Sequence, residues 1–175
     1  MTLVRFVAKI SKIGIWTILS LPKSASAKLP SRGLVIVDGT INGKSFQAPL
    51  EPDGRKGHWM KMDKTMLKSA NADVGSNLIL EIEPVKELPE PKIPSDLMNS
   101  LKKDKEAIKL WKDITPLARW DWIRWINGTK NPQTRKIRID KTLSKLNSGK
   151  RNACCFNRSE CTDPDVSHRG MLIEA

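Results

Sequence analysis

Lys130, Arg135 and Arg124, together with Trp120, are the residues whose types and spacing best suit chemistry, and that chemistry is anion binding. Arg135 stands one turn after an expected helix start, where unpaired backbone N–H groups and the helix macrodipole favour negative charge. A forked guanidinium, with Lys130 in the preceding loop, strengthens such a site. We therefore predict an anionic ligand at this loop, with Trp120 offering a stacking face beside Arg124.

Purely structural interpretations of the same residues stay open. Arg135 can pair with a carboxylate such as Asp121 and hold two helices together, because buried charges are rarely left unpaired. Trp120 can pack against an earlier helix instead of forming an exposed platform. Neither alternative is excluded by the pattern of residues.

Two helices must position these side chains. Thr115-Pro116 and Asn131-Pro132 each place a capping side chain before a proline in the first helical turn. Glycines end the two segments at 128 and 149. We expect one helix over 116–128 and a second over 132–149.

A helical wheel assigns a direction to each side chain. In the first helix Trp120 and Arg124 point nearly opposite to the apolar face, whereas in the second helix Arg135 shares the apolar face. The cations expected to point outward from the second helix are Arg138, Lys141 and Lys145. The apolar faces consist of Ala118, Trp122, Trp125 and Ile126 in the first helix and of Ile139, Leu143 and Leu146 in the second.

Residues 1–84 are predicted to form a small β domain of about six strands with one short helix. Segments rich in β-branched and aromatic residues alternate with turn signals, among them Ser11-Lys12 and Asn42-Gly43, and the second pair is typical of a type I′ hairpin turn. Asp63 is placed to cap the helix. Strands this short, joined by hairpins, bury their apolar faces by closing into a barrel or a sandwich. The expected strands cover 4–10, 13–19, 33–43, 44–52, 58–62 and 78–84.

A proline-rich linker over 85–94 follows, and its composition favours an extended, semi-rigid chain. Residues 95–151 are expected to form a helical bundle in which Ser95 and Asp104 cap two helices ahead of the central pair. The fold class is therefore α+β, a small β-barrel followed by a helical bundle. The residues of these two helices that are expected to pack on the central pair are Leu97, Leu101, Ile108 and Trp111.

The segment 152–175 differs in composition and contains all three cysteines. Together with a histidine they supply four ligands, the number that tetrahedral zinc requires. Adjacent cysteines reach one ion poorly and no Cys-x-x-Cys pair is present, so we expect no metal site. A disulfide or redox-sensitive pair is one alternative, and a polar tail that docks through Phe156 or Met171 is the preferred one. The four weak metal candidates are Cys154, Cys155, Cys161 and His168.

The positive charge is concentrated in the helical part. The chain has 31 basic and 19 acidic residues, a net charge of +12, and residues 93–151 alone carry 15 basic against 6 acidic residues. Such a surface raises encounter rates with nucleic acid, acidic proteins or anionic membranes without specifying any of them. We expect an anionic ligand or an acidic protein as partner, with nucleic acid as the alternative. No apolar stretch approaches the roughly 20 residues needed to span a bilayer.

The N-terminal residues have part of the composition of a secretory signal peptide. Arg5, Lys9 and Lys12 precede an apolar run over 13–21, and Ala25-Ser26-Ala27 would suit a signal peptidase. The apolar run is short, however, and it continues into the alternation that is typical of a strand. We therefore expect a cytoplasmic protein, with secretion as the alternative.

Motifs of the common catalytic and cofactor sites are absent from the sequence. It contains no tyrosine, GxSxG, GxxxxGK[ST], GxGxxG or HExxH, and its two histidines are His58 in an expected turn and His168 in the tail. We expect a protein that is not an enzyme and that uses no cofactor.

Two family resemblances follow from particular motifs. The segment from about Phe6 to Pro84, with Leu21-Pro22, VDGTING at 37–43 and a short helix after Asp63, resembles a widespread bacterial β-barrel family of unknown function. The segments IPSDLMNSL, WKDITPLARWDWIRWI and TKNPQTRKIRI resemble the YdeI/OmpD-associated bacteriocin-protection family. The hallmark of that family is Thr-Arg followed by Arg-Ile, here Thr134-Arg135 and Arg138-Ile139.

The resemblance covers about residues 3–151, and it implies both a particular fold and a role. It implies a double-split β-barrel, related to the barrel of AbrB-type DNA-binding regulators, ahead of the helical domain. It also implies a protective role, although the family name describes a phenotype and no chemistry. The alternative function is therefore a nucleic-acid-binding regulator that uses an AbrB-like barrel and basic helices.

Overall fold

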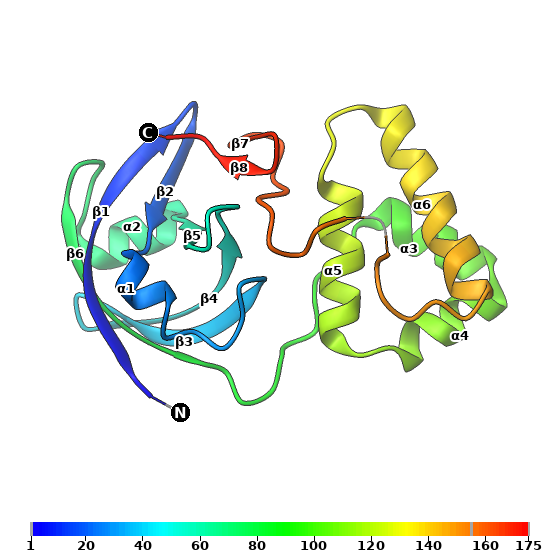
Figure 1. The fold of residues 1–175 in the computed structure, drawn as a ribbon, viewed down its shortest axis with the longest axis horizontal. Helices are drawn as coiled ribbons and strands as arrows, with labels where there is room; N and C mark the ends of the chain where they lie inside the picture. Colours follow the sequence, from blue (N-terminus) through cyan, green and yellow to red (C-terminus); the bar gives the residue numbers. More distant parts are fainter. Residues whose placement is uncertain (1, 155, 175) are drawn as a thin grey trace. The chain divides into compact units, whose positions relative to one another are not determined.

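The computed structural model describes residues 2–154 and 156–174, which form two compact units (Figure 1). The barrel unit contains residues 2–86, 158–161 and 165–174, and the helical unit contains 87–154, 156–157 and 162–164. The predicted α+β class, with a β-barrel ahead of a helical bundle, is confirmed. Within the described residues no helix is both long and apolar enough to cross a membrane.

Six antiparallel strands close the barrel in the order β1-β2-β5-β4-β3-β6. Alternate residues of each strand point inward, as the two-residue period of a strand requires. On β1, for example, Phe6 and Ile10 are buried and lie opposite Leu80 of β6 and Leu19 of β2. The strands are β1 (Val4–Ile13), β2 (Trp16–Ser20), β3 (Val35–Ile41), β4 (Lys44–Pro52), β5 (His58–Lys61) and β6 (Asn77–Pro84).

The first hairpin turns later than predicted. Ser11 and Lys12 continue β1 and pair with β2, and the chain turns at Gly14, where φ is +57°. The prediction of a turn at Ser11-Lys12 is therefore wrong, because cross-strand pairing extends both strands to the glycine that accepts a positive φ most readily. The Asn42-Gly43 prediction is confirmed, since both residues have the positive φ of a type I′ turn.

The segment with signal-peptide composition belongs to the barrel unit. It contributes β1, β2 and a short helix, α1 (Lys23–Ser26), which the sequence reasoning did not predict. Ala25 and Ser26 are buried, and the Ser26 Oγ atom accepts a hydrogen bond from the backbone N–H of His58. The predicted short helix is α2 (Lys64–Ala70), and the Asp63 side chain caps it by accepting from the Met66 N–H at 2.7 Å, as expected.

The last residues of the chain complete the hydrophobic core at one side of the barrel. They form a two-stranded hairpin, β7 (Ser167–His168) and β8 (Met171–Leu172). The loop that contains Gly54 holds this hairpin: Arg55 donates to the Leu172 carbonyl at 2.7 Å, and the Leu172 N–H donates to the Asp53 carbonyl at 2.9 Å. A Cβ atom on Gly54 would lie 2.1 Å from the Gly170 carbonyl oxygen, so the approach requires glycine. The shared cluster consists of Ile13, Ile18, Trp59, Cys161, Val166 and Leu172.

The helical unit contains α3 (Ser95–Lys103), α4 (Lys105–Asp113), α5 (Pro116–Asn127) and α6 (Pro132–Asn147). The predicted caps Asp104, Thr115 and Asn131 are confirmed, because each side chain accepts a backbone N–H of the first turn that follows it. Ser95 is not a cap, since α3 begins after Pro94 without a capping side chain. The buried core includes Leu97, Leu101, Trp111, Trp122, Ile126, Ile139 and Leu146.

Helix α5 is buried on more sides than the helical wheel predicts. Arg124 was expected to point outward, yet it is 6% exposed and lies over the ring of Phe156. Arg138 of α6 was also expected outward, but it donates to the Trp125 carbonyl at 2.6 Å and its guanidinium lies over the Trp125 ring. These two predictions are wrong because Phe156 covers Arg124 and because Arg138 packs on Trp125 of the neighbouring helix. A wheel of one helix cannot represent either contact.

His58 makes the stability of the barrel unit sensitive to acid. The imidazole is 1% exposed, its Nε2 atom lies 3.0 Å from the Gly33 carbonyl oxygen, and its Nδ1 atom has no hydrogen-bond partner among the described residues. Burial lowers the pKa of His58, and the hydrogen bond to Gly33 and the charge of Asp53 offset this only in part. The folded chain therefore resists protonation of this ring.

We expect the free energy of unfolding of the barrel unit to fall as the pH drops below about 6.5, the ordinary histidine pKa. The unfolded chain takes up the proton in that range while the folded chain does not, so the contribution is complete above it and is lost on acidification. Hydrogen exchange of the barrel amides at pH 7.5 and 5.5 measures the effect. The variant His58→Gln should lose most of this pH dependence, and an equal dependence in the variant would contradict the assignment.

Candidate functional site

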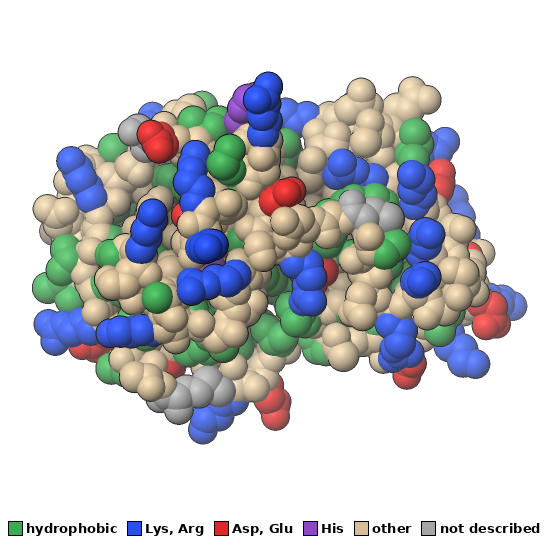
Figure 2. All heavy atoms as spheres, in the orientation of Figure 1, with side chains coloured by type: hydrophobic (Ala, Val, Ile, Leu, Met, Phe, Trp, Pro, Cys, Tyr) green, Lys and Arg blue, Asp and Glu red, His purple; other side chains and the backbone are tan. Residues whose placement is uncertain are grey.

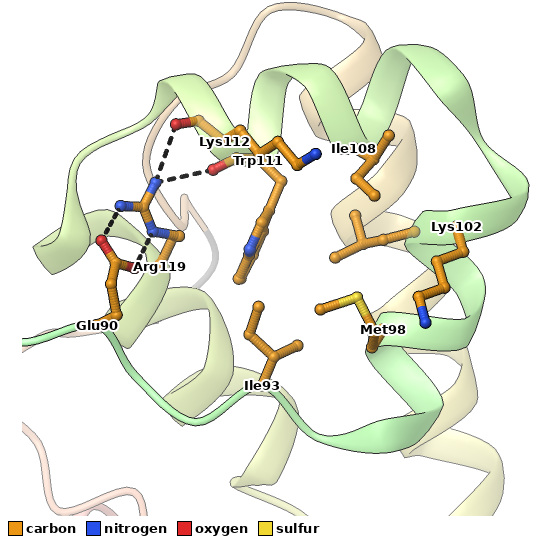
Figure 3. A pocket seen from close by; sticks show the side chains of 9 residues that line it. Glu90, Ile93, Met98, Lys102, Ile108, Trp111, Lys112 and Arg119 are labelled. Atoms are coloured by element: carbon orange, nitrogen blue, oxygen red, sulfur yellow. Dashed lines mark hydrogen bonds and ion pairs between the residues drawn. The ribbon is translucent and has the colours of Figure 1, made fainter.

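A cavity of about 460 Å³ lies within the helical unit, between α3, α4, the start of α5 and the linker (Figure 3). This size falls in the range of small-molecule sites. The cavity wall is mainly apolar, and charged side chains stand at its edges. The lining residues are Glu90, Ile93, Met98, Leu101, Lys102, Ile108, Trp111, Lys112 and Arg119.

The apolar wall follows from the periodicity of two amphipathic helices. Met98 and Leu101 lie three residues apart on α3, as do Ile108 and Trp111 on α4, so each pair shares a face. The Trp111 indole is seen edge-on in Figure 3 and turns one face toward Met98 and Ile108. It is 3% exposed, and its Nε1 atom has no hydrogen-bond partner in the described part of the chain.

Arg119 forms the polar end of the cavity. Its Nη1 atom donates to the carbonyls of Trp111, Lys112 and Ile114, which are the unpaired acceptors at the end of α4. Its Nε and Nη2 atoms both donate to the Glu90 carboxylate, and the Nε contact measures 2.8 Å. One buried guanidinium thus caps a helix on one edge and binds a carboxylate on the other (Figure 3).

The linker that carries Glu90 is anchored to α5. The Trp120 indole N–H donates to the Pro89 carbonyl at 2.8 Å, and Pro91 is buried. Trp120 is therefore half-buried under the linker, and neither of its two predicted environments, an earlier helix or an exposed stacking platform, is observed. The anchored linker supplies Ile93 and Glu90 to the cavity wall.

Two lysines stand at the edge of the cavity without a carboxylate partner among the described residues. Lys102 of α3 and Lys112 of α4 are exposed, and Figure 3 shows the Lys112 side chain extending over the cavity. The lining therefore carries three cations and a single anion, Glu90. This excess of positive charge beside an apolar wall suits a ligand with an apolar body and a negative group.

At the loop between α5 and α6, side chains of the protein itself bind several of the groups that were predicted to hold an anion. Arg135 is half-buried and pairs with Asp96 of α3 at 2.6 Å, and it also donates to Asn127 at 2.8 Å. The Arg135 hydrogen bonds lower the pKa of Asp96, as expected for a carboxylate held in its charged form. Asn131 already accepts from the N–H groups of Gln133 and Thr134 at the helix start.

The four predicted site residues thus have different environments. Lys130 is exposed in the loop, Arg124 is buried with Asp121 at 3.3 Å, and Trp120 lies under the linker. Arg135 does pair with a carboxylate, as the structural interpretation expected, but with Asp96 in place of Asp121. None of the four lines the cavity.

The chain matches two family models in succession. The model described as Bacteriocin-protection, YdeI or OmpD-Associated matches residues 90–149, and the model described as Domain of unknown function (DUF1905) matches residues 4–82. Over residues 90–149 the helical unit is thus similar to the YdeI/OmpD-associated family. A DUF1905 domain precedes it, as the sequence resemblance implied. A comparison with curated proteins found no match.

The cavity lies entirely within the YdeI/OmpD-associated segment. Glu90 is its first matched residue, and Arg119 is the last residue of the cavity lining along the chain. Sequence reasoning missed both residues as a site, because they are 29 positions apart and the glutamate belongs to a linker without periodicity. Ile108 and Trp111 were predicted to pack on the central helices, and their spacing along α4 could not show that they also line a cavity.

The tail candidates outside the YdeI/OmpD-associated segment do not form a metal site among the described residues. Cys154 is exposed in the helical unit, whereas Cys161 is buried in the core of the barrel unit and His168 is exposed on β7. The prediction for Cys155 lies outside the described residues. Phe156, one of the two predicted docking residues, packs on the helical core, and Met171 is 38% exposed.

Proposed function

We propose that this protein is a non-catalytic, cytoplasmic binding protein of the bacteriocin-protection type that holds a small amphiphilic anion in the cavity of its YdeI/OmpD-associated domain. The observation that carries the proposal is an apolar cavity edged by Lys102 and Lys112, neither of which has a carboxylate partner among the described residues. We therefore place the anionic ligand in this cavity and not at the α5–α6 loop, because Arg135 and Arg124 are already paired with carboxylates.

The lining supports binding in preference to catalysis. The described residues that line the cavity include no histidine, cysteine or serine, and the single carboxylate is held by Arg119. A general base or nucleophile is most often one of these groups, and the two lysines of the lining stand exposed at its edge. His58, the one buried histidine of the described chain, contributes to the barrel core instead.

We expect the double variant Lys102→Gln/Lys112→Gln to bind the fluorescent anion 8-anilinonaphthalene-1-sulfonate about 5- to 30-fold more weakly than the wild type. The estimate assigns each partly exposed ion pair about 0.5–1 kcal/mol. Fluorescence titration of the folded protein measures the affinity. The apolar wall is unchanged in this variant, so binding should weaken without being abolished.

The matched control is Lys103→Gln/Lys109→Gln, which removes the same charge from the same two helices at exposed positions outside the lining. It should change the affinity less than twofold, apart from the general effect of lower net charge. An equal loss in both double variants would mean that the probe senses only the overall charge, and the cavity proposal would then be abandoned.

Nucleic-acid binding is the second candidate, and it is favoured by the charge of the helical unit. On the face drawn in Figure 2, Lys and Arg side chains lie over the helical unit with few acidic neighbours. Lys136 and Lys141 of α6 are exposed, and neither lines the cavity. Fluorescence anisotropy with duplex DNA across a salt series tests this candidate, since each phosphate contact contributes about −0.9 to the logarithmic salt slope. Absence of binding at low salt would remove it.

A further inference from the structure

We propose that Glu90 occupies on Arg119 the position of a ligand carboxylate, so that the linker and the ligand compete for one guanidinium. This inference rests on the proposed function and narrows its ligand to an amphiphilic carboxylate. The cavity then has two states, one closed by Glu90 and one in which the bound molecule replaces it.

Arg119 has one edge of its guanidinium that is not used by the backbone of α4. Three backbone carbonyls at the end of α4 satisfy Nη1, and the remaining edge, formed by Nε and Nη2, binds both oxygens of Glu90. Two parallel N–H groups in one plane match the two oxygens of a carboxylate, and the bound Glu90 shows this geometry. The Arg119 side chain is 10% exposed, so an anion bound there is largely shielded from water.

Glu90 is held by little else. Its side chain is 64% exposed, and it makes no hydrogen bond to any described residue other than Arg119. The linker itself stays anchored through the bond from Trp120 to Pro89. The carboxylate can therefore swing into solvent without detaching the linker, and solvation offsets much of the cost because the group is already mostly exposed.

The cavity has room for the apolar part of a ligand next to the Glu90–Arg119 pair. Glu90 and Arg119 stand at one side of the cavity with the Trp111 ring next to them, and Met98 and Lys102 lie at the other side (Figure 3). A carboxylate that replaced Glu90 would direct an attached apolar group along the indole face. A planar aromatic body suits that face, because stacking adds to the area buried.

The test compares two probes with the same body, 2-naphthoate and 2-naphthalenesulfonate, by isothermal titration calorimetry. We expect Glu90→Gln to bind 2-naphthoate about three- to tenfold more tightly than the wild type, because removing a competitor raises the fraction of protein that is competent to bind. The gain for 2-naphthalenesulfonate should be smaller, since a sulfonate oxygen is a weaker hydrogen-bond acceptor than a carboxylate oxygen. The control Glu87→Gln removes the same charge from the same linker outside the cavity lining and should leave both affinities nearly unchanged.

Each outcome separates this inference from the proposed function. If Glu90→Gln binds 2-naphthoate no more tightly than Glu87→Gln does, Glu90 is only part of the cavity wall and the proposed competition for Arg119 is wrong. The proposed function is decided separately, by the response of the anilinonaphthalene probe to the substitutions of Lys102 and Lys112. An equal gain for both naphthalene probes would mean that removal of negative charge, and not carboxylate exchange, is responsible. If neither naphthalene probe binds the wild type or Glu90→Gln, the carboxylate inference is overturned.

Discussion

Replacement of Arg119 by alanine will lower the free energy of unfolding of the helical unit by about 2–4 kcal/mol. The variant loses the ion pair with Glu90 and leaves the carbonyls of Trp111, Lys112 and Ile114 without their donor at the end of α4. Because Arg119 is 8% exposed, water replaces these hydrogen bonds poorly. Urea unfolding followed by circular dichroism at 222 nm reports mainly on this unit, which contains the four longest helices described.

The control for this variant is Arg151→Ala. Arg151 also pairs with a carboxylate, Asp113, and also donates to a backbone carbonyl, but both side chains are more than half exposed. Exposed pairs of this kind contribute about 0–1 kcal/mol. If Arg119→Ala costs no more than Arg151→Ala, then the buried hydrogen bonds of Arg119 to the end of α4 contribute no more than an exposed pair does, and the site loses its structural basis.

Replacement of Leu172 by alanine will destabilise the barrel unit by about 2–4 kcal/mol. Leu172 is 6% exposed and packs with Trp59, Ile13 and Ile18, so the shorter side chain leaves a cavity in a cluster that is otherwise filled. The backbone bonds of Leu172 to Asp53 and Arg55 remain, and the hairpin should therefore stay in place while its packing weakens. Thermal unfolding and hydrogen exchange of the barrel amides measure the loss.

The neighbouring Met171 supplies the matched control, because it lies on the same short strand and is 38% exposed. We expect Met171→Ala to change the stability by less than about 0.5 kcal/mol. Similar effects of the two substitutions would show that β8 is not part of the barrel core. Removal of residues 158–175 should cost more than Leu172→Ala, since Cys161 and Val166 leave the same cluster.

The sequence by itself determined the features that depend on near neighbours along the chain. Asp63, Asp104, Thr115 and Asn131 cap helices because each acceptor reaches an N–H two or three residues ahead, a distance that is independent of the rest of the fold. The Asn42-Gly43 turn is local for the same reason. The strand alternation and the motifs of the two families were likewise sufficient to predict a barrel followed by helices.

Only the tertiary structure decided which side chains meet. Arg135 pairs with Asp96, 39 positions away, and Arg119 pairs with Glu90 across 29 positions, because loops and the linker carry the chain back over the helices. A helical wheel gives the direction of Arg124 but not the Phe156 ring that covers it. The cavity belongs to this second class, since its wall combines two helices with a linker that has no period of its own. Burial of each charge depends on the path of distant segments, and that path is set by packing of the whole chain.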